Sequence, residues 1–174
     1  SSDIVFLCVT GSPQVEAAVG GAEGLLTGAA RGLVIVDTST AEPESTNRLR
    51  ALCESQGVHY VDAPLVRTPV DAEAGRLNVM VGATEAQFAQ LEPVLKAFAE
   101  NVFHVGAPGA GHVIKLLNNF IAQASCTAVA EAFALGYNET GDTPRALAWY
   151  GRALAANDGS AAQRATEQWA NLAA

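Results

Sequence analysis

The chain has 174 residues, of which 49% are hydrophobic and 16% charged, and its formal net charge is -8. This composition can bury one ordinary domain core, with part of a second, and it excludes general disorder. The acidic balance repels phosphate backbones, so we expect no nucleic-acid partner. No apolar stretch near either end is typical of a membrane span or a leader, so we expect no membrane partner.

The cysteines and histidines point away from disulfides and metals. The three cysteines, Cys8, Cys53 and Cys126, are odd in number, far apart and each inside an apolar segment. Buried reduced thiols of this kind are typical of a cytoplasmic protein. The sequence has no CxxC, no HExxH and no histidine cluster, so we expect no metal site.

The first two thirds of the chain alternate strand and helix patterns. Short apolar runs predict strands at residues 4–9, 33–36, 58–62, 77–81 and 101–105. Helix starts are predicted at Ser12-Pro13, at Ser39 with Glu42, and at Thr84 with Gln87. Residues 65–76 show no clear periodicity. The alternation indicates a doubly wound α/β sheet.

The pattern changes after residue 106. A long apolar helix is predicted over residues 111–137, roughly 40 Å at 1.5 Å per residue. Because it is apolar on nearly all sides, we expect it to be buried between two domains or against another subunit. Helical pattern resumes at Thr143-Pro144 and continues to the end, with an interruption at residues 157–159.

Lys115 is the most unusual charged residue of the chain, which has only one other lysine, Lys96. It lies inside the long apolar helix, where an isolated ammonium is costly unless it snorkels, pairs or faces a cleft. Desolvation lowers a lysine pKa towards the range useful for proton transfer. Asn118 and Asn119 flank it at helical spacing, and Gly111 is expected to leave open space beside it. The alternative is a lysine at a helix edge, with the side-chain amides of Asn118 and Asn119 bonded to neighbouring loops.

Two polar segments follow strands, at the sheet edge where open α/β proteins bind ligands. In Asp62–Pro69, Arg67 and Thr68 can fix an anionic group. The alternative is a surface arginine that pairs with Asp71 or Glu73. In the other segment, Asp37–Thr40, capping of the next helix by Ser39 or Thr40 explains most of the pattern. The three histidines, His59, His104 and His112, are scattered and are expected to have structural roles.

Several of these segments, taken in order, resemble the β-hydroxyacid dehydrogenase family, which includes 3-hydroxyisobutyrate, tartronate-semialdehyde and 6-phosphogluconate dehydrogenases. The matching segments are Asp3–Phe6, Val36–Thr40, Asp62–Pro64, Glu73–Leu77, Val79–Gly82, Phe103–Gly106 and Gly109–Asn119. The last is the most specific, with a glycine pair, then Lys115, then Asn119. The resemblance covers roughly Ser2–Tyr137.

The resemblance implies an NAD- or NADP-dependent enzyme that oxidises a small β-hydroxyacid or reduces the matching semialdehyde. Lys115 would be the general base in oxidation and the general acid in reduction. Substrate contacts would come from Val66, Arg67, Thr68, Asn118 and Asn119. Cofactor contacts would come from Val9, Thr10, Thr38, Ser39 and Thr40.

The chain departs from the family in the substrate loop. The family has Ser-Gly-Gly where this chain has Val66, Arg67 and Thr68. A branch resembling sulfolactaldehyde reductase carries Gly-Arg-Thr there, so we expect Arg67 to select a substrate with a sulfonate or a second carboxylate. Two alternatives remain: an inactive α/β module used for dimerisation, and a relative of imine reductases. Lys115 and Asn119 argue against the second.

The expected fold class is α/β, a partial doubly wound, Rossmann-like sheet followed by a long interdomain helix and a truncated all-α domain. Residues 1–107 are expected to be the C-terminal part of a Rossmann-like dinucleotide-binding domain. Residues 108–174 would begin an all-helical domain for dimerisation and substrate binding, making a homo-oligomer. No GxGxxG follows any predicted strand, and the C-terminal helices are too few to bury the long helix, so both ends are expected to be truncated.

Overall fold

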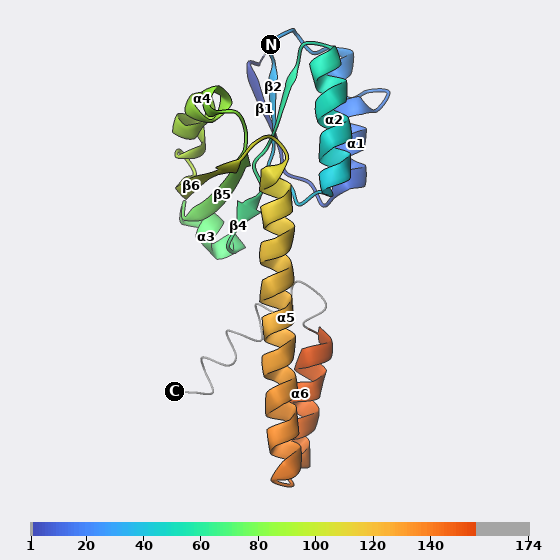
Figure 1. Cartoon of the computed structure of the whole chain (residues 1–174), viewed down its shortest axis with the longest axis vertical. Helices are drawn as coiled ribbons and strands as arrows, with labels where there is room; N and C mark the ends of the chain where they lie inside the picture. Colours follow the sequence, from blue (N-terminus) through green and yellow to red (C-terminus); the bar gives the residue numbers. More distant parts are fainter. Residues whose placement is uncertain (1, 156–174) are drawn as a thin grey trace. The chain divides into compact units, whose positions relative to one another are not determined.

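The computed structural model describes residues 2–155 (Figure 1). The chain divides into two compact units, Ser1–Leu116 and Leu117–Ala174. The long helix α5, Ala110–Glu139, crosses this boundary, so its first two turns belong to the first unit. The predicted interruption at residues 157–159 lies outside the described residues.

The first unit is an α/β sheet with helices on both faces (Figure 1). Its elements are β1 Ile4–Leu7, α1 Ser12–Gly20, a 3-10 turn Leu25–Thr27, β2 Val34–Asp37, α2 Pro43–Ser55, β3 His59–Asp62, β4 Leu65–Val66, α3 Pro69–Glu73, β5 Leu77–Gly82, α4 Glu85–Leu95 and β6 Ala99–Gly106. All five predicted strands are present. The two additional elements, β4 and α3, lie in the stretch without periodicity.

The sheet is mixed, with strand order β1-β2-β3-β5-β4 and β6 paired to β5. The strands β1, β2 and β3 are parallel, whereas β5 runs antiparallel to β3 and β4. A parallel return needs a crossover of a dozen or more residues, and only residues 67–76 join β4 to β5. The chain therefore turns back on itself there, and β6 then runs parallel to β5.

The apolar strand runs arise because β2 is buried on both faces. Val34 and Val36 belong to the core cluster that contains Leu91 and Leu95 of α4. Ile35, between them, belongs to the opposite cluster, which is covered by α1 and α2. Both faces of this strand exclude water, so the sequence shows no polar alternation.

The capping predictions have mixed outcomes. The Thr84–Gln87 capping box is confirmed, with each backbone N–H donating to the other side chain. The Ser39 prediction is wrong, because α2 begins at Pro43 and its N-cap makes no side-chain hydrogen bond. The hydroxyl of Ser39 instead accepts from the N–H of Val9 at 3.0 Å.

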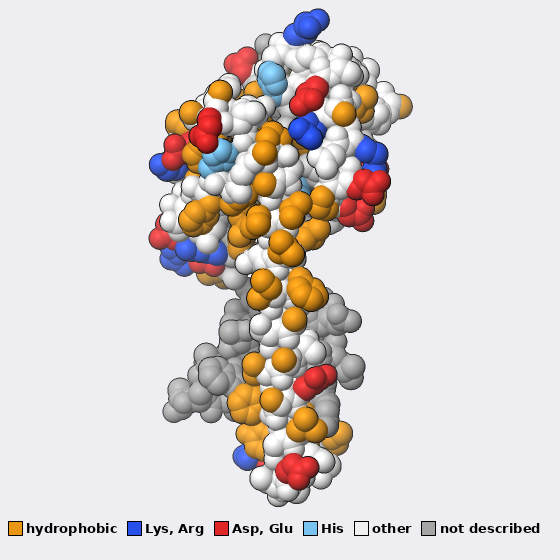
Figure 2. Space-filling view, viewed as in Figure 1, with side chains coloured by type: hydrophobic (Ala, Val, Ile, Leu, Met, Phe, Trp, Pro, Cys, Tyr) orange, Lys and Arg blue, Asp and Glu red, His pale blue; other side chains and the backbone are white. Residues whose placement is uncertain are grey.

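The second unit contains the rest of α5 and the helix α6, Thr143–Ala155. The helices pack through Ala130, Ala134 and Trp149, and the Phe133 ring stacks on Trp149 at 4.7 Å between centroids. The expectation that α5 is buried on nearly all sides is wrong for this chain alone. Large apolar side chains along α5 are exposed, including Phe120, Ile121 and Leu135, and Figure 2 shows hydrophobic atoms along it.

The exposed helix also meets a crude criterion for a membrane span. Over its best 18-residue window α5 has a mean hydropathy of 1.2, and only 6% of that window is buried. Core helices of soluble proteins reach the same length and hydropathy, so these two properties do not by themselves make α5 a membrane helix.

Candidate active site

Three turns meet at one edge of the sheet. Because β1, β2 and β3 are parallel, Leu7, Asp37 and Asp62 stand side by side at their carboxyl ends. The backbone N–H and hydroxyl of Thr38 both donate to the Leu7 carbonyl, at 2.8 and 2.6 Å. The N–H of Leu65 donates to the Thr38 carbonyl at 3.2 Å. Sheet topology thus brings together the segments that the sequence singled out.

The predicted cofactor contacts divide into buried and exposed groups. The hydroxyls of Thr38 and Ser39 are used inside the protein, the first on Leu7 and the second on the Val9 amide. Thr10 and Thr40 are exposed, and Val9 is half-buried. Thr38 and Ser39 therefore shape the turns, while Thr10 and Thr40 are the side chains that a ligand can reach.

The end of β2 carries a buried carboxylate. Asp37 accepts hydrogen bonds from the Ser39 N–H at 2.9 Å and from the Tyr60 hydroxyl at 2.6 Å. Burial, followed by the charge of Asp37, raises the pKa of Tyr60 far above its ordinary value. Tyr60 therefore stays a donor at any working pH.

The end of β3 carries a second buried carboxylate, which binds the start of α5. The Gly109 N–H donates to Asp62 Oδ1 at 2.7 Å, and the His112 N–H donates to Asp62 Oδ2 at 3.0 Å. Burial raises the pKa of Asp62, and the two backbone donors and the nearby His112 oppose that rise. A helix start carries a partial positive charge, which favours a carboxylate at this place.

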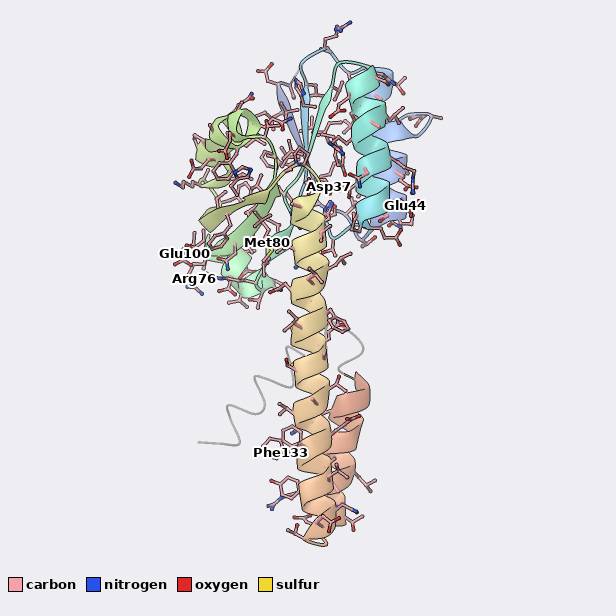
Figure 3. All side chains as sticks on the ribbon, in the orientation of Figure 1. Asp37, Glu44, Arg76, Met80, Glu100 and Phe133 are labelled. Carbon is pink, nitrogen blue, oxygen red and sulfur yellow. The ribbon has the colours of Figure 1, made fainter. Side chains whose placement is uncertain are left out.

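Gly111 lets α5 touch the sheet. A Cβ added there would lie 2.6 Å from the Met80 carbonyl oxygen and 2.7 Å from Asp62 Oδ2. A Cβ on Gly82 of β5 would lie 2.7 Å from the Gly111 nitrogen. The prediction of open space at Gly111 is therefore wrong, because the missing side chain is replaced by backbone of β5. Figure 3 labels Met80 and Asp37, on the strands against which this helix start packs.

Lys115 lies one helical turn after Gly111. The lysine is half-buried, and burial lowers its pKa below the ordinary value. Within residues 2–155 it makes no hydrogen bond or ion pair. Asn118 is exposed and Asn119 half-buried, and both follow on α5 beyond Leu116. The other lysine, Lys96, is exposed and pairs with Glu92 at 2.8 Å.

Arg67 has a strained backbone. Its φ of 85° makes it the one non-glycine residue with positive φ in the described part of the chain. Its guanidinium donates to the Arg76 carbonyl at 2.5 Å and pairs with Glu100 of β6, and Figure 3 labels both partners side by side. The expected partners, Asp71 and Glu73, are not used. The family's glycine at this place fits the same backbone without strain.

Thr68 and Val66, the neighbours of Arg67, have structural contacts. The Thr68 hydroxyl donates to Asp71 at 2.8 Å and accepts the Asp71 N–H at 3.2 Å, which caps α3. Val66 pairs with Asn78 of β5. Among these three, only the guanidinium of Arg67 is a charged group for an anionic ligand.

His112 has more contacts than the sequence indicated. Its ring is fully buried, with Nδ1 at 2.7 Å from Thr46 Oγ1 and Nε2 at 3.2 Å from the Ser39 carbonyl. The same Nε2 lies 3.8 Å from Asp37 Oδ2. A structural role was expected for His112, but no local signal pointed to its partners. Residues 2–155 hold no cluster of potential metal ligands.

Comparisons with known proteins agree with this architecture. Residues 1–106 match the family model for the NAD binding domain of 6-phosphogluconate dehydrogenase. The 2-(hydroxymethyl)glutarate dehydrogenase of Eubacterium barkeri is 39% identical over 136 residues, which cover 78% of this chain and 45% of the relative. The chain spans about half the length of the curated relatives it matches.

Solved structures show the same fold. The 3-hydroxyisobutyrate dehydrogenase of Mycobacterium tuberculosis, solved with L-serine, has a TM-score of 0.71 and 31% identity, over 80% of this chain and 47% of that one. An imine reductase from Myxococcus stipitatus in complex with NADP+ has a TM-score of 0.62 at 20% identity, over 98% and 58%. At that identity the likeness shows the fold alone. The relatives thus confirm the resemblance to β-hydroxyacid dehydrogenases.

Proposed function

Because the chain belongs to the family of the NAD binding domain of 6-phosphogluconate dehydrogenase, we propose that it carries the acid–base lysine and substrate loop of an NAD- or NADP-dependent dehydrogenase. The substrate is a small anionic β-hydroxyacid or the matching semialdehyde. One observation carries the proposal. Lys115 is half-buried with a lowered pKa, one turn after a helix start that is hydrogen-bonded to the end of β3.

Lys115 is the residue that moves the proton. A lowered pKa increases the share of neutral amine near neutral pH, so Nζ can accept the hydroxyl proton in oxidation. The ammonium returns a proton to the carbonyl oxygen in reduction. Asn119, four residues on, is proposed to hold the substrate, with Asn118 assisting. NAD or NADP, when bound, supplies or accepts the hydride.

The turns after β1 and β2 suit one part of a dinucleotide. Thr10 and Thr40 are exposed beside the half-buried Val9, and the N-cap of α1, Gly11, has no side-chain hydrogen bond. An uncapped helix start after a parallel strand is favourable for negatively charged groups. We assign Val9, Thr10 and Thr40 to direct cofactor contact, with Thr38 and Ser39 shaping the turns.

Arg67 supports a narrower substrate class. The guanidinium is partly exposed and pairs with a carboxylate, Glu100, at the surface. The Eubacterium barkeri relative is named for 2-(hydroxymethyl)glutarate, which has two carboxylates. We assign Arg67 to the second anionic group of the substrate, which would replace Glu100. Arg67→Ala should lower kcat/KM for doubly anionic substrates selectively, and an unchanged substrate preference would argue against this role.

The helical part is proposed to form a homo-oligomer in the cytoplasm. Phe120, Ile121, Val129 and Leu147 are large apolar side chains exposed in the second unit. Burial of such side chains stabilises association by about 1.5–3 kcal/mol each when complete. Residues 1–107 are assigned to the dinucleotide side and residues 108–174 to the helical side. Analytical ultracentrifugation checks the association, and Phe120→Glu should weaken it.

A chimera tests the proposed reaction. Residues 3–137 replace the corresponding segment of the Eubacterium barkeri enzyme, and turnover is measured with NAD+ or NADP+ and several β-hydroxyacids. We expect turnover that Lys115→Met abolishes, while NADH fluorescence still reports cofactor binding. A folded chimera that binds NADH and assembles but turns over no hydroxyacid would favour the inactive dimerisation module.

A further inference from the structure

A buried polar cluster lies under the start of α5, and the proposed reaction uses none of its side chains. Its members are Asp37, Thr46, Tyr60, Asp62 and His112. Each is at most 2% exposed, and each has a hydrogen-bond partner. Buried polar groups at this density are costly unless they are fully bonded, so they fix one arrangement of the elements they join.

Asp62 holds the start of α5 from the sheet side. The first N–H groups of a helix have no carbonyl partner within it. The Asp62 carboxylate accepts two of them, at 2.7 and 3.0 Å, from residues 47 and 50 positions away in the chain. Hydrogen bonds to a charged acceptor are among the stronger ones in proteins. Two donors on two separate oxygens fix the rotation of the helix as well as its height.

His112 holds the same turn from the helix side. The Ser39 carbonyl can only accept, so Nε2 carries the proton of that contact, and Nδ1 meets the Thr46 hydroxyl of α2. The ring thereby joins α5 to α2 and to the turn after β2. Asp62 and His112 act on one helical turn from different elements.

The packing leaves α5 no room to rotate in this region. Gly111 and Gly82 bring the helix backbone against β5, where even a methyl group would overlap. Lys115 is three residues after His112, about 4.5 Å along the axis. Its position relative to the loop that follows β3 is therefore set by the turn that Asp62 and His112 hold.

We propose that Asp62 and His112 are positioning residues that hold the first turn of α5 and thereby place Lys115 beside the substrate loop. This inference rests on the proposed function, because placement matters only if Lys115 handles the proton. It assigns a role to two buried titratable side chains that the proposed reaction does not use.

The test uses the full chain and its two lysines. Both lysine amines are dimethylated with carbon-13 together with the N-terminal amine, and the two lysine NMR signals are titrated with pH, with Lys96 as the internal reference. Asp62→Asn keeps the shape but turns an amide N–H towards a backbone donor. We expect the Lys115 midpoint to rise towards the ordinary lysine value, because the loosened turn exposes the amine, while the Lys96 signal does not differ between the variants.

Thr46→Val is the milder variant and decides the matter if Asp62→Asn does not fold. It keeps the volume of the side chain and removes the hydroxyl, which contacts His112 and also the Glu42 carbonyl of its own helix, so we expect a smaller shift of Lys115 in the same direction. Thr84→Ala is the matched control, since it removes the cap of α4 and should lower stability without moving Lys115.

An unchanged Lys115 signal in folded Thr46→Val and Asp62→Asn protein would overturn the proposal, and so would equal shifts of both lysines. The reaction itself is tested separately by Lys115→Met in the chimera. A shifted Lys115 signal combined with full turnover of that variant would leave the positioning intact and refute the proposed chemistry.

Discussion

Replacing Gly111 with alanine tests the contact between α5 and the sheet. The new Cβ would lie 2.6 Å from the Met80 carbonyl, 2.7 Å from Asp62 Oδ2 and 2.8 Å from the Asp62 carbonyl. Real Cβ atoms essentially never approach a neighbour within 3.0 Å. The new Cβ would meet backbone oxygens and a carboxylate that is held by two hydrogen bonds. These atoms cannot give way, so the helix must move away by several tenths of an ångström.

The cost follows from two losses and one gain. Overpacking of this kind costs about 1–3 kcal/mol. Lengthening a hydrogen bond to a charged group sacrifices part of about 1.5–3 kcal/mol. Alanine in a helix gains about 1 kcal/mol over glycine. We expect a net loss of about 2 kcal/mol in the free energy of unfolding.

The same substitution at Gly136 is the matched control. Gly136 lies on the same helix, and a Cβ there would meet nothing within 4 Å. Only the helix propensity then acts, and we expect a gain of about 1 kcal/mol. Urea unfolding followed by far-ultraviolet circular dichroism measures both variants. Effects of the same sign at the two positions would refute the close packing at Gly111.

Three further predictions concern the loop, the lysine and the cofactor. Arg67→Gly should be about 1 kcal/mol more stable than Arg67→Ala in urea unfolding, since glycine relieves the positive φ and both lose the ion pair; equal stabilities would contradict the strain. Burial lowers the pKa of Lys115, so burying the charged amine destabilises the folded state fully at pH values below that pKa. This destabilisation disappears as the pH rises towards the ordinary value of 10.5. The difference in the free energy of unfolding between the unchanged chain and Lys115→Met should therefore narrow in alkaline solution and not in acid. The chain lacks GxGxxG, so calorimetry should find weak or no NAD(P) binding by these residues alone, and micromolar affinity would contradict this.

The predictable parts of the fold are those whose cause is local. The strand β2 can be predicted from the sequence, because burial on both faces requires an unbroken run of apolar residues. The capping box at Thr84 was readable because both partners lie within four residues. Ser39 is an example of a contact whose cause is not local. Its spacing from Glu42 is that of a helix cap, but its hydroxyl accepts a hydrogen bond from the N–H of Val9, which lies 30 residues earlier in the chain.

The candidate site divides in the same way. Lys115 stands out because its immediate neighbours are apolar, and that is local information. The partners of Asp62 are 47 and 50 residues away, so no spacing rule reveals them. A glycine likewise does not say whether its missing side chain leaves a void or admits a neighbour. At Gly111 the neighbour is Met80 of β5. That strand runs antiparallel to β4, which follows from the short connection between them and not from any pattern near Gly111.

The two halves of the candidate site are held with very different strength. Lys115 follows a turn fixed by buried hydrogen bonds, two of them to the Asp62 carboxylate, each worth about 1.5–3 kcal/mol. Arg67 is held by a partly exposed ion pair worth roughly 0–1 kcal/mol, set against a backbone strain of about 1–2 kcal/mol. The backbone at the proposed acid–base lysine is therefore held rigidly, whereas the guanidinium of Arg67 can exchange Glu100 for another anion at little cost. If the proposed roles hold, such a site would keep its chemistry fixed while its substrate preference changed through the loop of Arg67.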